Sequence, residues 1–229
     1  MATYDLEEQE QLAEIKVWWK QYGNLLINVL TAASLIVIAW QGWNWYQRNQ
    51  TAQASLVFNV LQKAVQEKDS QRTKAASGEL LEKFGGTSYA PLAALTAAKA
   101  MIEAGEAKTA KVQLLWVVEH GKDELRDLAR LRLAAVLLDE KAYDQALKHL
   151  DGSVSPSFEA RFQDYRGDVF TAQGKKAEAH AAYQNALARL AEADKNGKLN
   201  DLAQGWKTQS DAVYRELVQQ KLDALGGVK

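Results

Sequence analysis

The pattern of hydrophobic and polar positions changes once along the chain, close to its beginning. Residues 25–46 are mostly apolar and include no charged residue. From residue 52 onward, apolar residues recur every three or four positions, the spacing that places them on one face of an α-helix. The pattern predicts an all-α chain in which a single transmembrane helix precedes a series of amphipathic helices.

The uncharged run is long enough to cross a membrane. A helix over residues 25–46 would extend about 33 Å, and the hydrocarbon core of a bilayer is about 30 Å thick. Aromatic residues flank the run on both sides, and the rings of Trp and Tyr favour the headgroup boundary. The predicted membrane-interface anchors are Trp18, Trp19 and Tyr22 before the run, and Trp40, Trp43, Trp45 and Tyr46 at its C-terminal end.

Two other interpretations of this run are a buried core helix and a cleaved signal peptide. The small residues Ala52–Ala54 resemble a cleavage site, but the leading region is long and acidic, whereas a signal peptide begins short and basic. We therefore predict an uncleaved transmembrane helix at residues 24–46. Residues 1–23 are predicted to form a cytoplasmic tail with a short amphipathic helix.

Lysine and arginine near the ends of the run predict its orientation. Lys16 and Lys20 precede it, whereas Arg48 is the only base that follows it before Lys63. Because positive residues are enriched on the cytoplasmic side, this small bias places the N-terminus inside and residues 47–229 outside.

Residues 47–229 contain an internal repeat. Within Arg166–Leu187, small and aromatic residues stand at the offsets of a tetratricopeptide repeat, in which two helices approach closely and a glycine turns the chain between them. The same frame recurs 33 residues earlier, and again a further 36 residues earlier. The residues predicted to pack these helix pairs are Ala98, Gly105, Ala110, Ala134, Ala146, Gly167, Gly174, Ala179 and Tyr183.

These frames predict a tetratricopeptide-like solenoid closed by a capping helix. Solenoids offer extended surfaces that bind peptides or protein segments, and each end of the stack is closed by a capping element with a polar outer face. The alternative is a generic bundle of helical hairpins, in which Ala and Leu recur by helical spacing alone. The repeats are predicted at about residues 52–85, 88–121, 124–152 and 156–192, the first of them degenerate, and the capping helix at about residues 200–224.

Composition and motifs narrow the classes of function. The absence of cysteine excludes disulfides and thiol catalysis, and a net charge of −1 gives no reason to expect nucleic acid. The chain has no phosphate-binding glycine loop and no hydrolase or zinc-protease motif, so we predict no catalytic residue, no cofactor and no metal. The alternating charges of Lys122–Arg132 are predicted to form a solvated, ion-paired face. The three histidines, which are scattered, are His120, His149 and His180.

Several motifs together resemble one family. An acidic tail, the pattern K-x-W-W-x-x-x-G at Lys16–Gly23, a span that ends in aromatic residues, and Q-A-S-L-x-F at Gln53–Phe58 precede the degenerate repeats. In these features the chain resembles the YfgM-type ancillary subunits of the bacterial Sec translocon.

The resemblance implies a single-pass protein of the cell inner membrane whose C-terminal domain is periplasmic. It also implies association with SecYEG and with a membrane-anchored periplasmic chaperone, to which emerging polypeptides would be handed. Two alternatives remain: a regulator of the envelope stress response that acts through its cytosolic tail, and a generic membrane-anchored assembly scaffold.

Overall fold

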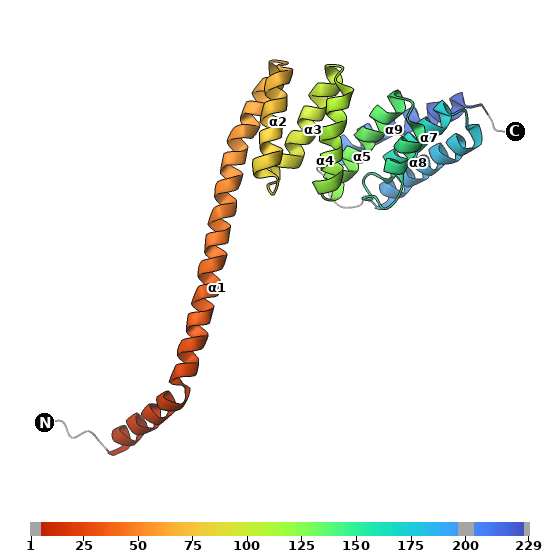
Figure 1. Cartoon of the computed structure of the whole chain (residues 1–229). Coiled ribbons are helices and arrows are strands. Elements are labelled where there is room, and N and C mark those ends of the chain that lie inside the picture. The colour runs from red at the N-terminus through yellow and green to blue at the C-terminus, as the bar shows by residue number, and fades with distance from the viewer. Residues whose placement is uncertain (1–5, 197–203, 227–229) are drawn as a thin grey trace. The chain divides into compact units, whose positions relative to one another are not determined.

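The computed structural model describes residues 6–196 and 204–226, and every regular element in these ranges is an α-helix (Figure 1). The predicted all-α class is confirmed. The helices are α1 (Leu6–Gln66), α2 (Ser70–Phe84), α3 (Tyr89–Glu103), α4 (Ala107–His120), α5 (Asp123–Asp139), α6 (Tyr143–Leu150), α7 (Glu159–Ala172), α8 (Lys176–Asn196) and α9 (Gln204–Ala224).

The long helix α1 joins three segments that the sequence pattern separates. The amphipathic segment, the apolar run and the first helix of the predicted first repeat are one continuous helix. Residues 47–53, between the apolar run and that repeat, contain neither glycine nor proline, so nothing in the sequence interrupts the helix there. Residues 1–5 of the predicted tail, and residues 200–203 of the predicted capping helix, lie outside the described residues.

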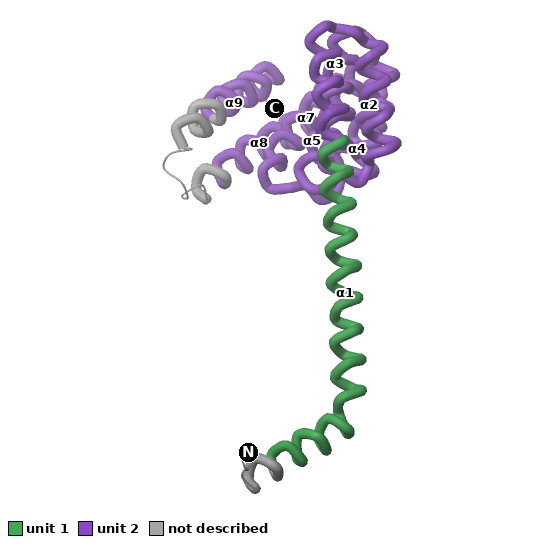
Figure 2. The backbone as a smooth tube through the Cα atoms, turned by 90° about the vertical axis from the view of Figure 1, so that its left-hand side faces the viewer, with its two compact units in different colours: residues 1–53 green, residues 54–229 purple. Residues whose placement is uncertain are grey.

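The chain divides into two compact units, shown in different colours in Figure 2. The anchor unit is Met1–Gln53 and the repeat unit is Ala54–Lys229. The division therefore falls inside α1, seven residues after the predicted end of the transmembrane segment at Tyr46.

Within the repeat unit, successive helices pair and the pairs stack in sequence order. The end of α1 with α2, α3 with α4, α5 with α6, and α7 with α8 form four repeats, and α9 packs on α8. One cluster of buried side chains runs through the repeats from Ala54 to Val169, and a second joins α8 to α9.

The turn inside each repeat has the same geometry. One residue in each turn takes a left-handed conformation, with φ of 54° at Lys68, 76° at Gly105, 59° at Lys141 and 75° at Gly174. The next amide donates back to a carbonyl five residues earlier, as when Glu106 N donates to Met101 O at 2.8 Å. These four residues therefore give a structural frame in which equivalent positions of the repeats can be compared.

In this frame the packing of the first repeat is reversed. Seven residues before the turn, the later repeats have the small residues Ala98, Ala134 and Gly167. Sixteen residues further on, their second helices have a large buried side chain: Leu114, Leu150 and Tyr183. The first repeat instead has Leu61 on the first helix and Ser77 on the second, both fully buried. The large and the small residue have exchanged helices, so the sequence of the first repeat departs from the pattern of the later repeats.

The expected solvated face of Lys122–Arg132 is wrong at two positions. Asp127 and Arg130 are buried, because the loop between α6 and α7 covers them. Arg130 donates to Asp127 Oδ1 at 3.1 Å and to the backbone oxygens of the loop, including Ser153 O at 2.9 Å. Asp127 Oδ2 accepts a bond from Ser155 N at 2.8 Å. This ion pair fixes the loop between the third and fourth repeats.

Candidate functional site

The apolar run of α1 is exposed along its whole length. Its nine strongly apolar side chains, from Leu25 to Ile38, are each between 37% and 69% exposed. Among the described residues, α1 is the helix long and apolar enough to cross a membrane. A soluble protein would bury such a surface, so its exposure agrees with contact to lipid.

The polar groups within this run are partly satisfied by the helix itself. Thr31 Oγ1 donates to Ile27 O, and Ser34 Oγ donates to Leu30 O, each at 2.8 Å. A hydroxyl that bonds to its own helix needs no water, so both residues are compatible with a hydrocarbon environment.

All seven predicted membrane-interface anchors lie on α1 and are exposed. Two pairs have neighbouring rings: the centroids of Trp18 and Tyr22 are 5.9 Å apart, and those of Trp43 and Tyr46 are 6.2 Å apart. Trp19 lies against Gly23, where an added Cβ would come within 3.2 Å of the indole ring. Their role at the headgroup boundary stays a prediction.

The residues predicted to pack the repeats lie in the expected helix pairs. Gly105 and Gly174 take the left-handed turn positions. An added Cβ at Gly167 would collide with the ring of Tyr183, so glycine permits the close approach of α7 and α8. The remaining members of the predicted set are fully buried alanines: Ala98, Ala110, Ala134, Ala146 and Ala179.

At the last repeat, a polar network holds α9. Lys221 Nζ donates to Asp164 Oδ1 and to Asp168 Oδ2, both at 2.8 Å. Tyr214 OH donates to the second oxygen of Asp164 at 2.9 Å, and Tyr183 OH donates to the second oxygen of Asp168 at 2.8 Å. One lysine of α9 therefore forms ion pairs with two carboxylates of α7.

Burial shapes the acid–base properties of this network. Burial raises the pKa of the Asp168 carboxyl, although Lys221 and Tyr183 act in the opposite direction. Burial lowers the pKa of Lys221, but its bonds to the two aspartates outweigh it, so the pKa lies above the ordinary value. The pKa of both tyrosines is raised, first by burial. Lys221 is therefore charged at neutral pH, and the network serves to dock α9.

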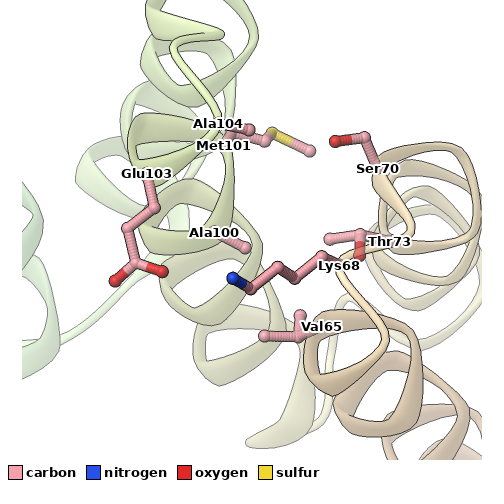
Figure 3. A pocket seen from close by; sticks show the side chains of 8 residues that line it. All are labelled: Val65, Lys68, Ser70, Thr73, Ala100, Met101, Glu103 and Ala104. Carbon is pink, nitrogen blue, oxygen red and sulfur yellow. The ribbon is translucent and has the colours of Figure 1, made fainter.

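A small pocket lies near the turn ends of the first two repeats (Figure 3). It is lined by side chains of the α1–α2 turn, of α2 and of the end of α3, and its volume is about 150 Å³. Typical small-molecule sites occupy roughly 300–1,000 Å³. In the described part of the chain, no group of three or more His, Asp or Glu side chains is placed to hold a metal.

The sequence patterns missed three functional or structural groups. Lys221 lies 53 or more residues from its aspartate partners, and no local spacing indicates the contact. Asp127 and Arg130 looked like surface charges. The exposed apolar residues Leu56 and Val60 belong to a run that looks like an ordinary amphipathic helix, and only their exposure distinguishes them.

The chain is similar to several known proteins. A family model described as a tetratricopeptide repeat-like domain matches residues 16–227. The ancillary SecYEG translocon subunit of Neisseria gonorrhoeae is 32% identical over 225 residues, covering 96% of this chain and 98% of the relative. The protein of the same name from Haemophilus influenzae is 31% identical over 185 residues, covering 80% and 90%. Among solved structures, MamA from Desulfovibrio magneticus RS-1 overlays with a TM-score of 0.48 at 18% identity, covering 76% of this chain and 97% of that chain.

Proposed function

The chain belongs to the tetratricopeptide repeat-like family that includes the ancillary SecYEG translocon subunits, and we propose that it is a membrane-anchored, protein-binding scaffold of the Sec translocon. Its partners would be the SecYEG channel and polypeptides close to it. The relative from Neisseria gonorrhoeae, which carries this name, matches 96% of the chain, so the match includes the anchor unit and the repeat unit.

One observation carries the proposal. The exposed apolar run and the first helix of the repeat unit are parts of the same uninterrupted helix. A repeat unit held in this way is confined to the membrane that contains its partner. Confinement raises the effective concentration, so contacts too weak to persist in solution can suffice.

We also propose on which side of the membrane the repeat unit lies and what its second partner is. Lys16 and Lys20 before the span, against Arg48 after it, support a cytoplasmic N-terminus and a periplasmic repeat unit in the inner membrane. We propose that the repeat unit there contacts a membrane-anchored chaperone and helps newly translocated chains reach it. A helical scaffold of this kind needs no catalytic group.

Purification of the intact chain from its native membranes in mild detergent tests the proposed partner. Wild-type chain is expected to recover SecY, SecE and SecG at near-stoichiometric levels. A control chain, in which residues 24–46 are replaced by an unrelated transmembrane helix, reports whether the anchor contributes to recovery. Wild-type chain that recovers no translocon component contradicts the proposed function.

Single cysteines test the orientation, since the natural chain has none. Ala13 and Ala181 are both exposed, on α1 and α8 respectively. A membrane-impermeant maleimide is expected to label Ala181→Cys in cells whose outer membrane is opened, and to label Ala13→Cys only after the inner membrane is broken. The opposite labelling would overturn the orientation without affecting the partner assignment.

A further inference from the structure

The first repeat has an exposed apolar face. Leu56 and Val60 of α1 are 66% and 48% exposed. With neighbouring side chains of α2 they line a groove of about 310 Å³. We call this surface the open face; its lining residues are Leu56, Val57, Val60, Arg72, Ala75, Ala76 and Glu79.

Positions equivalent to the open face are buried in the later repeats. Leu56 and Val60 stand twelve and eight residues before the left-handed residue Lys68. In the second repeat the same two positions hold Ala93 and Ala97, which are completely buried. In the third repeat they hold Ala129 and Leu133, and in the fourth Phe162 and Arg166; of these only Arg166 is not fully buried.

The preceding repeat provides this cover inside the stack, as in the contact of α2 with α3. Among the described residues of the repeat unit, the pair formed by the end of α1 and α2 comes first in the stack, and Leu56 and Val60 are exposed there. Apolar side chains are therefore exposed at the end of the solenoid, at positions that are buried in the later repeats. Such an exposed apolar surface indicates a binding site for a partner.

Ion pairs between successive repeats indicate which charge a helix bound to the open face would have. Lys74, six residues after the first left-handed residue, forms an ion pair with Glu106 in the turn of the second repeat. Lys111, six residues after the second, pairs with Glu140 in the turn of the third repeat at 2.5 Å. A lysine on the second helix of one repeat thus reaches an acid in the turn of the next.

The first repeat has an acid at both of these turn positions. Glu106 directly follows its left-handed residue, and Asp69 does the same after Lys68. Glu140 directly precedes its left-handed residue, as Glu67 does. The Glu67 side chain is 43% exposed and bonds only to bases of its own repeat, Arg72 and Lys63, in the contacts described here.

We propose that the open face is the docking site for one amphipathic helix of a partner protein, which takes the place of a preceding second helix. Its apolar stripe packs on Leu56 and Val60. A lysine or arginine near its first turn reaches Glu67, as Lys74 and Lys111 each reach one acid in the stack. Asp69 instead caps α2 by accepting from Arg72 N at 3.0 Å. The charge pattern favours a basic helix over an acidic one, and the missing cover favours a helix over an extended peptide.

This inference rests on the proposed function for the premise that a protein partner is present at the membrane. It adds the place on the repeat unit and the chemistry of the partner helix. Purification of wild-type chain tests the premise, whereas the variants below test only the open face, so the two can fail separately.

The first test compares two equally exposed positions. Leu56→Glu places a charge on the open face, and Val112→Glu places one at a position of α4 that is 63% exposed. If wild-type chain recovers its periplasmic partner from native membranes, Leu56→Glu is expected to lower the recovery about tenfold and Val112→Glu less than about twofold. Equal recovery with both variants would overturn the inference, provided that both keep the wild-type melting temperature.

Crosslinking identifies the occupant. A photoreactive residue in place of Val60, in intact membranes, is expected to form an adduct that maps to an amphipathic segment containing Lys or Arg in another protein. An adduct with lipid, with a second copy of this chain or with an acidic segment would overturn the inference, as would the absence of an adduct.

Charge reversal then tests the predicted ion pair. Glu67→Lys is expected to lower partner recovery about tenfold, while Glu119→Lys, on the exposed surface of α4, has no effect. Replacing the base of the crosslinked helix by glutamate is expected to restore binding to the Glu67→Lys chain. Failure of Glu67→Lys to weaken binding would show that the turn acids do not recognise the partner.

Discussion

The two ends of the repeat unit consist of the same kind of helix pair, but the outer face of only one of these pairs is covered by another helix of the repeat unit. At the C-terminal end α9 covers the last pair, and Val218, Tyr183 and Ala186 are buried between them. At the N-terminal end the first pair keeps Leu56 and Val60 exposed. One end is closed by the chain itself, whereas the other is open.

The difference indicates where stability and where binding reside. At the closed end, polar groups contact the chain itself, because Lys221 forms ion pairs with two aspartates of α7. The open end has an apolar surface and turn acids that the later repeats use for contacts between neighbours. Substitutions at the closed end should therefore change stability, and substitutions on the open face should change association.

The largest expected effect lies inside the first repeat, behind its open face. Leu61→Ala removes a fully buried side chain and should lower the free energy of unfolding by about 3 kcal/mol. Urea unfolding followed by circular dichroism measures this. Adding Ser77→Leu should restore only part of the loss, because Ser77 Oγ donates to Gln113 Oε1 at 2.8 Å and the amide would lose that partner. Full restoration would show that the reversed packing matters only by volume.

At the closed end, Lys221→Met should loosen α9. The substitution leaves the Asp164 and Asp168 carboxylates facing each other without a cation, and we expect a loss of about 2 kcal/mol, less than for a fully buried pair since Lys221 is 28% exposed. Hydrogen exchange of the α9 amides should accelerate accordingly. Lys108→Met, on the exposed surface of α4, is the matched control, and equal protection in both variants would contradict the account.

Substitutions in the turns at the two ends should change the stability less, and the two changes should have opposite signs. The left-handed position is Gly174 in the last repeat and Lys68 in the first. Gly174→Ala should cost about 1 kcal/mol, because a Cβ disfavours this conformation. Lys68→Gly should stabilise the first repeat by less, about 0.5 kcal/mol, because glycine also increases the entropy of the unfolded chain. Thermal unfolding of the two variants checks both signs.

The smallest expected effect is a difference in how the stability of the third repeat and that of the closed end depend on pH. Burial lowers the pKa of His149, and the nearby Arg130 and Lys148 lower it further. The unfolded chain therefore takes up this proton first, and the stabilisation present above about pH 6.5 is lost as the pH falls through the folded-state pKa. Asp168 behaves oppositely, since its raised pKa makes its contribution largest at low pH.

Acidification from pH 7 to pH 5 should thus weaken the third repeat without weakening the docking of α9. Hydrogen exchange at both pH values, corrected for intrinsic rates, measures the two responses separately. His149→Gln should reduce the change in α6, and an unaltered change in that variant would assign the pH dependence to another group.

The anchor and the repeats could be predicted from the sequence because each leaves a local pattern. The uncharged run indicates a span by length alone, and the small residues Ala98, Ala134 and Gly167 recur at a nearly constant period. The reversed pair Leu61 and Ser77 breaks that period, so the first repeat was predicted only as a degenerate one.

Other features depend on contacts between distant segments and could not be predicted. Arg130 and Asp127 are buried because a loop more than twenty residues away covers them. Lys221 meets its aspartates only after α9 folds back on the last repeat. The open face is apparent only when burial is compared between equivalent positions, which requires the structural frame of the four turns.

The proposed association of this chain with the Sec translocon, with α1 in the membrane, is tested most directly by isolating SecYEG through a tag on SecE. The isolation uses mild detergent, and the amount of the chain that accompanies SecYEG is measured. We expect the intact, membrane-embedded chain to be recovered with SecY, and Leu56→Glu to remain with SecY while losing the partner proposed for the open face. SecYEG isolated without the chain, from membranes in which the chain is abundant and intact, would contradict the account.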